Sequence, residues 1–462
     1  MNTSADPEIL ARGPSADLVV TAAEVAAGRL SAAADLERAL GAADSPACRH
    51  AFVRRFDAMA RATAQAVDAA RSAGAPVPTL AGLAVSVKDL FDVAGVPSTA
   101  ASRSLADAAP AATDSTVVAR LRAAGAALIG HTNLTEFAFS GVGINPHHGT
   151  PANAGTRALD PTPRIPGGST SGGAVTVAAG AAWAALGSDT RGSIRVPAAL
   201  HGLVGFKNTQ SLTPNDGCLP LSFTLDTSCA ITRSVRDAVL LHEVLACRRV
   251  RLRGRPLRAL RLALPGGGML DGLDATVARA FERALARLRA AGADLVEVAL
   301  PADDAPSLSS GQISAAEAWA WHRGRLDARQ ADYDPRVLAR IRSGSSIQAA
   351  DYIDRLQARR RWIAQVEASA RDIDAFICPT VPIVAPALQP LVADDEAFFA
   401  TNALLLRNPS VVNYLDGCAL SLPCQAADEL PVGLMIWAPA MQDDTVLDVS
   451  MAIERELARP GR

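Results

Sequence analysis

One sequence pattern recurs along this chain: apolar residues at helical spacing, then a glycine, then a short apolar run. It occurs in "ARLRAAGAALIGHTN" at 119–133 and in "DATVARAFERALARLRAAGADLVEVAL" at 274–300. Further short apolar runs lie at 80–95, 375–380 and 430–439. Alternation of helices with short buried strands is typical of layered α/β proteins with a parallel or mixed sheet. We therefore expect an α/β fold, with a central mixed sheet flanked by helices.

Domain organisation follows from length and linkers. A chain of 462 residues is long enough for two or three domains. However, no exact internal repeat and no long low-complexity linker divides it. We expect a single α/β/α domain over 1–462, with a helical region at 1–75 and another at about 305–375. Residues 16–74 have apolar residues at helical spacing, and Ser31 is a candidate N-cap.

Composition bears on partners and location. A net charge of -2 gives no reason to expect nucleic acid or an anionic membrane as a partner. The arginine-rich segment 248–261 has no interleaved aromatic residue, so a solvated linker is favoured over a patch for nucleic acid or an acidic partner. The start of the chain lacks a basic segment followed by an apolar one, so we expect a cytoplasmic protein.

Cysteine and histidine spacing bears on metals. The seven cysteines include no C-x-x-C pair and the seven histidines no H-x-x-x-H pair. Reduced core thiols are therefore expected, and neither a metal nor a cofactor.

A loop rich in glycine and hydroxyl groups is the first candidate for chemistry. The segment 167–173 reads "GGSTSGG", and the small apolar residues from Ala174 to Ala185 have the character of a buried helix. A glycine-rich loop before a helix suits a phosphate cradle, a hydrolase site with a serine nucleophile, or a tight loop without chemistry. The spacings G-x-x-x-x-G-K-[ST] and G-x-G-x-x-G are both absent, which disfavours the phosphate cradle.

Lysine usage is the second signal. Only Lys88 and Lys207 are lysine among 45 basic residues. Unlike a guanidinium, a buried ammonium can lose its proton, so a lysine in this chain is a candidate base. Lys88 ends an apolar strand, where desolvation lowers the pKa of an ammonium, whereas the case for Lys207 is weaker. A neutral lysine near serines suggests Ser–Lys nucleophilic catalysis; the alternative is that either lysine only packs or caps.

Four motifs occur in order between about 80 and 235: "SVKD", "GGSTSGG", "GSDTRGSIRVPAALHGLVGFKNT" and "FTLDTSCAITRSVRDA". Together they resemble the amidase signature family, and this region is its signature core. The weaker matches "ICPTVP" and "LPVGLMIWAP" extend the resemblance nearly to the C-terminus. The resemblance implies the fold of that family and a helical insertion at about 305–375 that shapes the pocket.

The resemblance also implies roles for individual residues. Lys88 is the ultimate base, Ser169 is the bridging serine on a non-proline cis peptide bond, and Ser193 is the nucleophile. Ser193 follows Ser169 by 24 residues, the separation that the family has. The oxyanion would bind to backbone N–H groups of Thr190, Arg191, Gly192 and Ser193.

Arg191 departs from the family pattern, which often has glycine there. Its side chain would either pair with a nearby acid such as Asp189 or reach a substrate carboxylate. The other candidate substrate-binding residues are Gly141, Gly143 and Ile144, within 139–148. The segments 315–324 and 402–415 are further candidates for pocket walls.

These observations favour an amidohydrolase that cleaves a small, largely apolar amide, with carbamate or ester cleavage as further activities. The alternatives are the A-subunit of a glutamine-dependent amidotransferase and an anion-binding module without turnover. As partners we expect a small amide-type substrate and, at most, a second copy of the chain.

Overall fold

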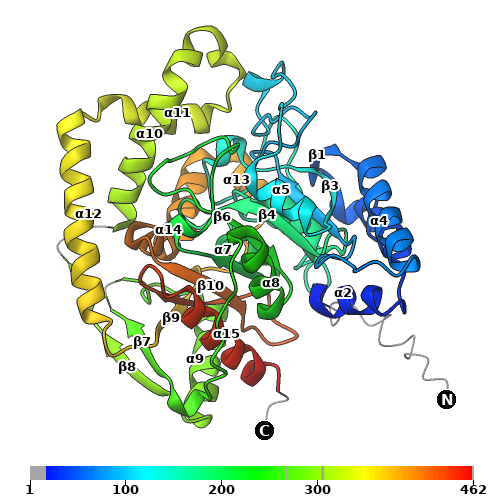
Figure 1. Ribbon diagram of the computed structural model, residues 1–462. Helices are drawn as coiled ribbons and strands as arrows, with labels where there is room; N and C mark the ends of the chain where they lie inside the picture. Colours follow the sequence, from blue (N-terminus) through cyan, green and yellow to red (C-terminus); the bar gives the residue numbers. More distant parts are fainter. Residues whose placement is uncertain (1–16, 267, 303–305, 460–462) are drawn as a thin grey trace.

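The computed structural model describes residues 17–266, 268–302 and 306–459 (Figure 1). The first residues of the predicted helical region at 1–75, and residue 305 at the predicted start of the second one, lie outside this part.

One mixed sheet runs through the described chain. Its strands lie in the order β1-β3-β2-β4-β6-β5-β10-β11-β9-β7-β8. The pairs β2–β3, β2–β4, β7–β8 and β7–β9 are parallel, and the other pairs are antiparallel. The strands are β1 (Phe52–Arg55), β2 (Ala84–Lys88), β3 (Ala127–Thr132), β4 (Ala184–Ser188), β5 (Val204–Lys207), β6 (Ser228–Thr232), β7 (Arg261–Pro265), β8 (Asp294–Val298), β9 (Ala375–Pro379), β10 (Cys418–Pro423) and β11 (Gly433–Ala438).

Helices flank this sheet, as the sequence predicts. One group contains α2 (Leu18–Ala26), α5 (Thr116–Ala123), α8 (Val235–Ala246), α9 (Ala275–Ala290) and α15 (Asp443–Leu457), in which α8 touches α2, α5 and α15. The other contains α6 (Ser171–Ala178), α7 (Arg195–His201) and α14 (Asp395–Leu415), with α10 (Pro306–Arg329), α11 (Pro335–Ser343) and α12 (Ala349–Ser369) stacked on α14 or on one another. The remaining helices are α3 (Ala32–Ala43), α4 (Asp57–Ser72) and α13 (Leu388–Ala393).

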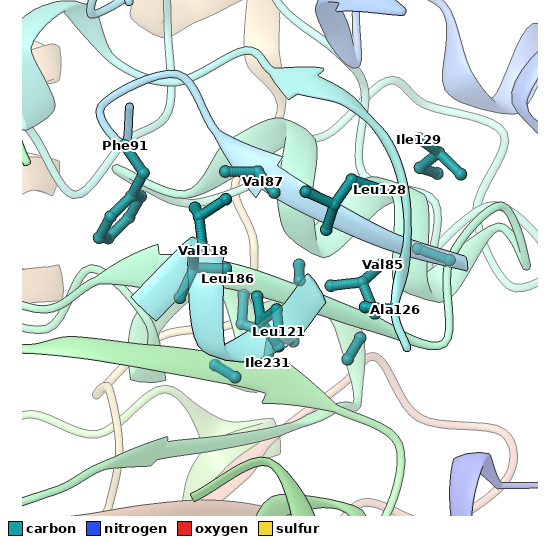
Figure 2. Close-up of a cluster of buried hydrophobic side chains, with 14 of the residues drawn as sticks. Val85, Val87, Phe91, Val118, Leu121, Ala126, Leu128, Ile129, Leu186 and Ile231 are labelled. Carbon is teal, nitrogen blue, oxygen red and sulfur yellow. The ribbon is translucent and has the colours of Figure 1, made fainter. Parts of the chain in front are cut away.

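Apolar side chains of the sheet pack under α5. Figure 2 shows Val85 and Val87 of β2, Leu186 of β4, and Val118 and Leu121 of α5 in one cluster, all of them buried. Because β2 and β4 are anchored in this cluster, the residues that follow at their carboxyl ends are held in fixed positions.

Two local predictions differ from the structure. The region 16–74 is not entirely helical, because Phe52–Arg55 forms the edge strand β1. The buried helix expected over Ala174–Ala185 ends at Ala178, and Ala184 already begins β4. Gly180 has φ of +81°, a left-handed conformation that stops the helix and turns the chain toward the sheet.

The cap and the arginine-rich segment match expectation. The Ser31 hydroxyl accepts a hydrogen bond from Ala34 N–H and so caps α3. In 248–261, Arg248 pairs with Asp444 and Arg255 with Asp374, as in a solvated linker. All seven cysteines are free.

In the described ranges no helix combines the length and apolar character needed to cross a bilayer.

Candidate active site

Lys88 lies where two parallel strands end side by side. Val87 of β2 pairs with Leu186 of β4, which brings Lys88 next to Ser188. The buried Lys88 Nζ donates hydrogen bonds to Ser169 Oγ at 2.8 Å and to Ser188 Oγ at 2.9 Å. Carboxyl ends of parallel strands are the usual location of ligand sites in α/β folds. The structure thus brings together Lys88 and Ser169, which are 81 positions apart in the sequence.

Burial lowers the pKa of Lys88 to about 8, although negative groups nearby, Asp226 and Asp189 among them, oppose this shift. A lysine with this pKa has an accessible neutral form near neutral pH. Burial also lowers the pKa of Lys207, but its Nζ donates to the carbonyl oxygens of Asn208 and Gly417. Lys207 therefore ties two segments of backbone together, whereas the hydrogen bonds that Lys88 donates within the described residues all go to hydroxyl groups.

The serine loop adopts the backbone that the resemblance implies. The Gly168–Ser169 peptide bond is cis. Gly168 N–H donates to the carbonyl of Gly141 at 2.7 Å, and the Ser169 carbonyl accepts from Thr135 N–H at 3.2 Å. Gly141 N–H in turn donates to Asn402 Oδ1 at 2.9 Å, so α14 positions the loop through an intermediate segment.

A buried ion pair shapes the turn that carries Ser193. Asp189, directly after β4, pairs with Arg195 at 2.9 Å and accepts hydrogen bonds from Gly192 N–H and Ile194 N–H. Burial alone would raise the pKa of Asp189, but Arg195 outweighs it and holds the pKa at about 2. Gly192 has φ of +124°, and a Cβ there would lie 2.6 Å from Pro409 Cβ, so the turn requires glycine.

This arrangement corrects one expectation. Asp189 pairs with Arg195 and not with Arg191, because the turn at Gly192 directs the two arginines differently. Arg191 Nε donates to Ser410 Oγ at 3.2 Å. Its guanidinium lies against Gly311 of α10, where an added Cβ would come within 3.1 Å of Nη1.

The backbone donors near Ser193 are not equivalent. Gly192 N–H is already engaged by Asp189. Within the described residues, the N–H groups of Thr190 and Ser193 donate no hydrogen bond, so both are available to an oxyanion. The two serine loops touch through their backbones, since Thr170 N–H donates to the Ser193 carbonyl at 3.3 Å.

A small cavity opens beside Ser193. Its lining residues are Ala138, Phe139, Ser140, Thr190, Arg191, Ser193, Leu221, Ser314, Arg340 and Leu406. The segments 139–148 and 402–415 contribute Phe139, Ser140 and Leu406. Helix α10 contributes Ser314, which lies one residue before the segment 315–324.

The remaining predicted substrate-binding residues lie elsewhere. Gly141 holds the serine loop, and Gly143 packs against it, since a Cβ added at Gly143 would lie only 2.4 Å from the Gly167 carbonyl oxygen. Ile144 lines a separate groove with His50 and Asn145. Sequence reasoning missed Ser188 and Arg340. Nothing distinguishes Arg340 from the other arginines, whereas Ser188 lies in the same sequence motif as Ser193.

No cluster of three or more potential metal ligands occurs in the part of the chain that the structure describes.

Residues 36–447 match the model of the family described as Amidase. The chain belongs to the amidase signature family. It is thus a hydrolase of carbon–nitrogen bonds other than peptide bonds.

Similar proteins match nearly the whole length of this family member. It is 35% identical over 407 residues to the 2-amino-5-chloromuconic acid deaminase of Comamonas testosteroni, covering 86% of each chain. It is 34% identical to the A-subunit of the glutamyl-tRNA(Gln) amidotransferase of Salinispora tropica, covering 96% of this chain and 95% of that one. A crystal structure of an amidase superimposes with a TM-score of 0.86 at 32% identity, covering 96% of this chain and all of the other.

Proposed function

We propose that this amidase signature protein hydrolyses a small amide through an acyl-enzyme on Ser193, with Ser169 and Lys88 as its proton relay. The observation that carries the proposal is the 2.8 Å hydrogen bond from the buried Lys88 Nζ to Ser169 Oγ, beside the turn that bears Ser193. Carbamates and esters pass through the same kind of tetrahedral oxyanion, so their cleavage belongs to the same proposal.

In the acylation step, the Ser193 oxygen attacks the carbonyl carbon of the substrate. Its proton passes to Ser169, whose own proton passes to neutral Lys88. The oxyanion accepts hydrogen bonds from the backbone N–H groups of Thr190 and Ser193, with Arg191 N–H as a third proposed donor. Removal of one such donor costs about 2.7–4 kcal/mol in other acyl-transfer enzymes.

Collapse of the intermediate breaks the C–N bond. The protonated Lys88 returns its proton through Ser169 to the leaving nitrogen, which departs as an amine or ammonia. Water then attacks the acyl-enzyme while Lys88 accepts its proton through Ser169. The same proton returns through Ser169 to the Ser193 oxygen as the ester bond breaks and the carboxylic acid is released. Each turnover consumes one water and leaves the relay in its starting protonation state.

A second candidate function is that of an amidotransferase A-subunit. It is favoured by the 34% identity to the Salinispora tropica protein, which extends over 95% of that chain. Glutaminase activity and co-purification with partner proteins would distinguish this role from that of a free amidase.

Replacement of Ser193 by alanine tests the proposed function. We expect turnover of amides, anilides, carbamates and p-nitrophenyl esters to vanish while the fold is retained, because one hydroxyl is lost. A fluorophosphonate probe should label the parent protein at Ser193 and leave Ser193→Ala unlabelled. An acyl-enzyme detected by intact mass spectrometry in Ser193→Ala would contradict the assignment.

A further inference from the structure

Two arginines from distant parts of the chain line the cavity that contains Ser193. Arg191 follows β4, and Arg340 lies near the end of α11. Burial, together with the charge of Arg191, lowers the pKa of Arg340 to about 9. Burial lowers the pKa of Arg191 to about 10. Both values lie well above 7, and both side chains remain cations.

The contacts of Arg340 leave its charge unbalanced within the described residues. Its Nη1 donates to the carbonyl oxygen of Phe139, and its guanidinium lies 4.9 Å from the centroid of the Phe139 ring. No carboxylate of the described residues forms an ion pair with it. Arg340 is half-buried, and a guanidinium partly shielded from water is costly unless an anion accompanies it.

The buried acids around the cavity are engaged elsewhere. Asp189 pairs with Arg195. Asp226 accepts hydrogen bonds from the Thr190 hydroxyl and from two backbone N–H groups. Glu317 accepts from Ser222, Thr224 and Tyr352. These carboxylates organise the loops around the cavity and do not neutralise Arg340.

We propose that Arg191 and Arg340 bind a carboxylate of the substrate, so that the amide cleaved at Ser193 is a small amide acid. This inference rests on the proposed function, because it concerns the same site. A planar carboxylate matches the donor fork of a guanidinium. The apolar lining residues Ala138, Leu221 and Leu406 suit a short carbon chain between the carboxylate and the amide. The expected substrate is therefore apolar in its middle and anionic at one end.

The test compares matched acids and neutral amides. Malonamate, succinamate and glutaramate, the monoamides of short dicarboxylic acids, are each assayed against the corresponding diamide. We expect kcat/KM of at least one monoamide to exceed that of its diamide by about tenfold or more, because the acid forms a charge-assisted hydrogen bond that the diamide lacks. A preference for the diamide at every chain length would overturn the proposal.

Variants of Arg340 localise the effect. Arg340→Gln should reduce the acid-to-diamide ratio of kcat/KM about tenfold or more, mainly through KM for the acid. Arg340→Lys keeps the positive charge but loses the planar pair of guanidinium donors, so it should retain part of the preference for the acid. If Arg340→Gln does not fold, Arg340→Lys is the variant that tests the proposal. The matched control is Arg342→Gln, which removes an exposed cation from the same helix and should leave the ratio unchanged. An unchanged ratio in folded Arg340 variants would overturn the proposal.

Probe labelling separates this proposal from the proposed function. Failure of the fluorophosphonate to label Ser193 would overturn the proposed function itself. If Ser193 is labelled, succinate should slow labelling of the parent protein and have less effect on the Arg340 variants. Equal protection by succinamide, or protection by inorganic phosphate but not by succinate, would overturn the carboxylate site while leaving the nucleophile intact.

Discussion

Replacement of Lys88 by methionine is expected to leave the protein at least as stable at pH 7 as the parent. Burial lowers the pKa of Lys88 from 10.5 to about 8. At about 1.4 kcal/mol for each pKa unit, the charged ammonium costs the folded state about 3 kcal/mol at pH 7. Methionine is an unbranched apolar side chain that can occupy much of the same space without a charge.

The substitution also removes two favourable contacts. Lys88 donates to Ser169 and Ser188, and a typical hydrogen bond contributes about 1 kcal/mol to stability. The net expectation at pH 7 is therefore a gain of about 1 kcal/mol in the free energy of unfolding of Lys88→Met.

The stability difference between Lys88→Met and the parent should change with pH in a defined direction. Because the folded pKa lies below the unfolded one, the unfolded parent binds more protons between about pH 8 and 10.5. The parent therefore gains stability as the pH rises through this window, and Lys88→Met does not. Its advantage should shrink above about pH 8 and reverse by about pH 10.

Urea unfolding at about pH 7, 8.5 and 10 measures this difference, with Arg342→Met as a control that removes an exposed cation. A loss of more than about 1 kcal/mol in Lys88→Met at pH 7 would refute the reasoning, as would a difference from the parent that does not change with pH.

Three further predictions concern the relay. Lys88→Arg should abolish acylation as completely as Lys88→Ala, since a guanidinium cannot accept a proton; retention of more than about a tenth of the parent rate, a loss under ~1.4 kcal/mol, would exclude a neutral base. Ser169→Ala should slow single-turnover acylation strongly but leave detectable activity, and a parent-like rate would mean that no proton passes through Ser169. The acylation rate of the parent should rise with pH around a midpoint near 8, where Lys88 becomes neutral; a rate that is flat between about pH 6 and 9 would contradict this.

The parts of the site that sequence predicts are those built on short-range motifs. Lys88 ends a short strand whose apolar residues are contiguous in the sequence. Ser193 lies in a turn marked by its own motif, although the strand β4 before that turn begins within the helix expected at 174–185. Strand β1 escapes prediction because it has only four residues, two of them arginine, at the edge of the sheet.

The parts that sequence does not predict depend on packing between distant segments. The proximity of Ser188 to Lys88 is set by the parallel register of β2 and β4. Arg340 approaches Ser193 because of the way α11 and α10 pack together and α10 packs on α14. The pairing of Asp189 with Arg195 depends on the left-handed turn at Gly192, whereas proximity in sequence favours Arg191.

The helices α10, α11 and α12 lie at one side of the molecule and contribute no strand to the sheet (Figure 1). They supply Ser314 and Arg340 to the cavity, while Lys88, Ser169 and Ser193 come from β2, the serine loop and the turn after β4. In the proposed mechanism, the proton relay thus lies outside the stretch of the gene that encodes 306–369, while part of the cavity lining lies inside it. Substitutions within 306–369 are therefore expected to alter which molecules are accepted without rebuilding the relay, which makes this stretch a target for directed evolution of new specificities.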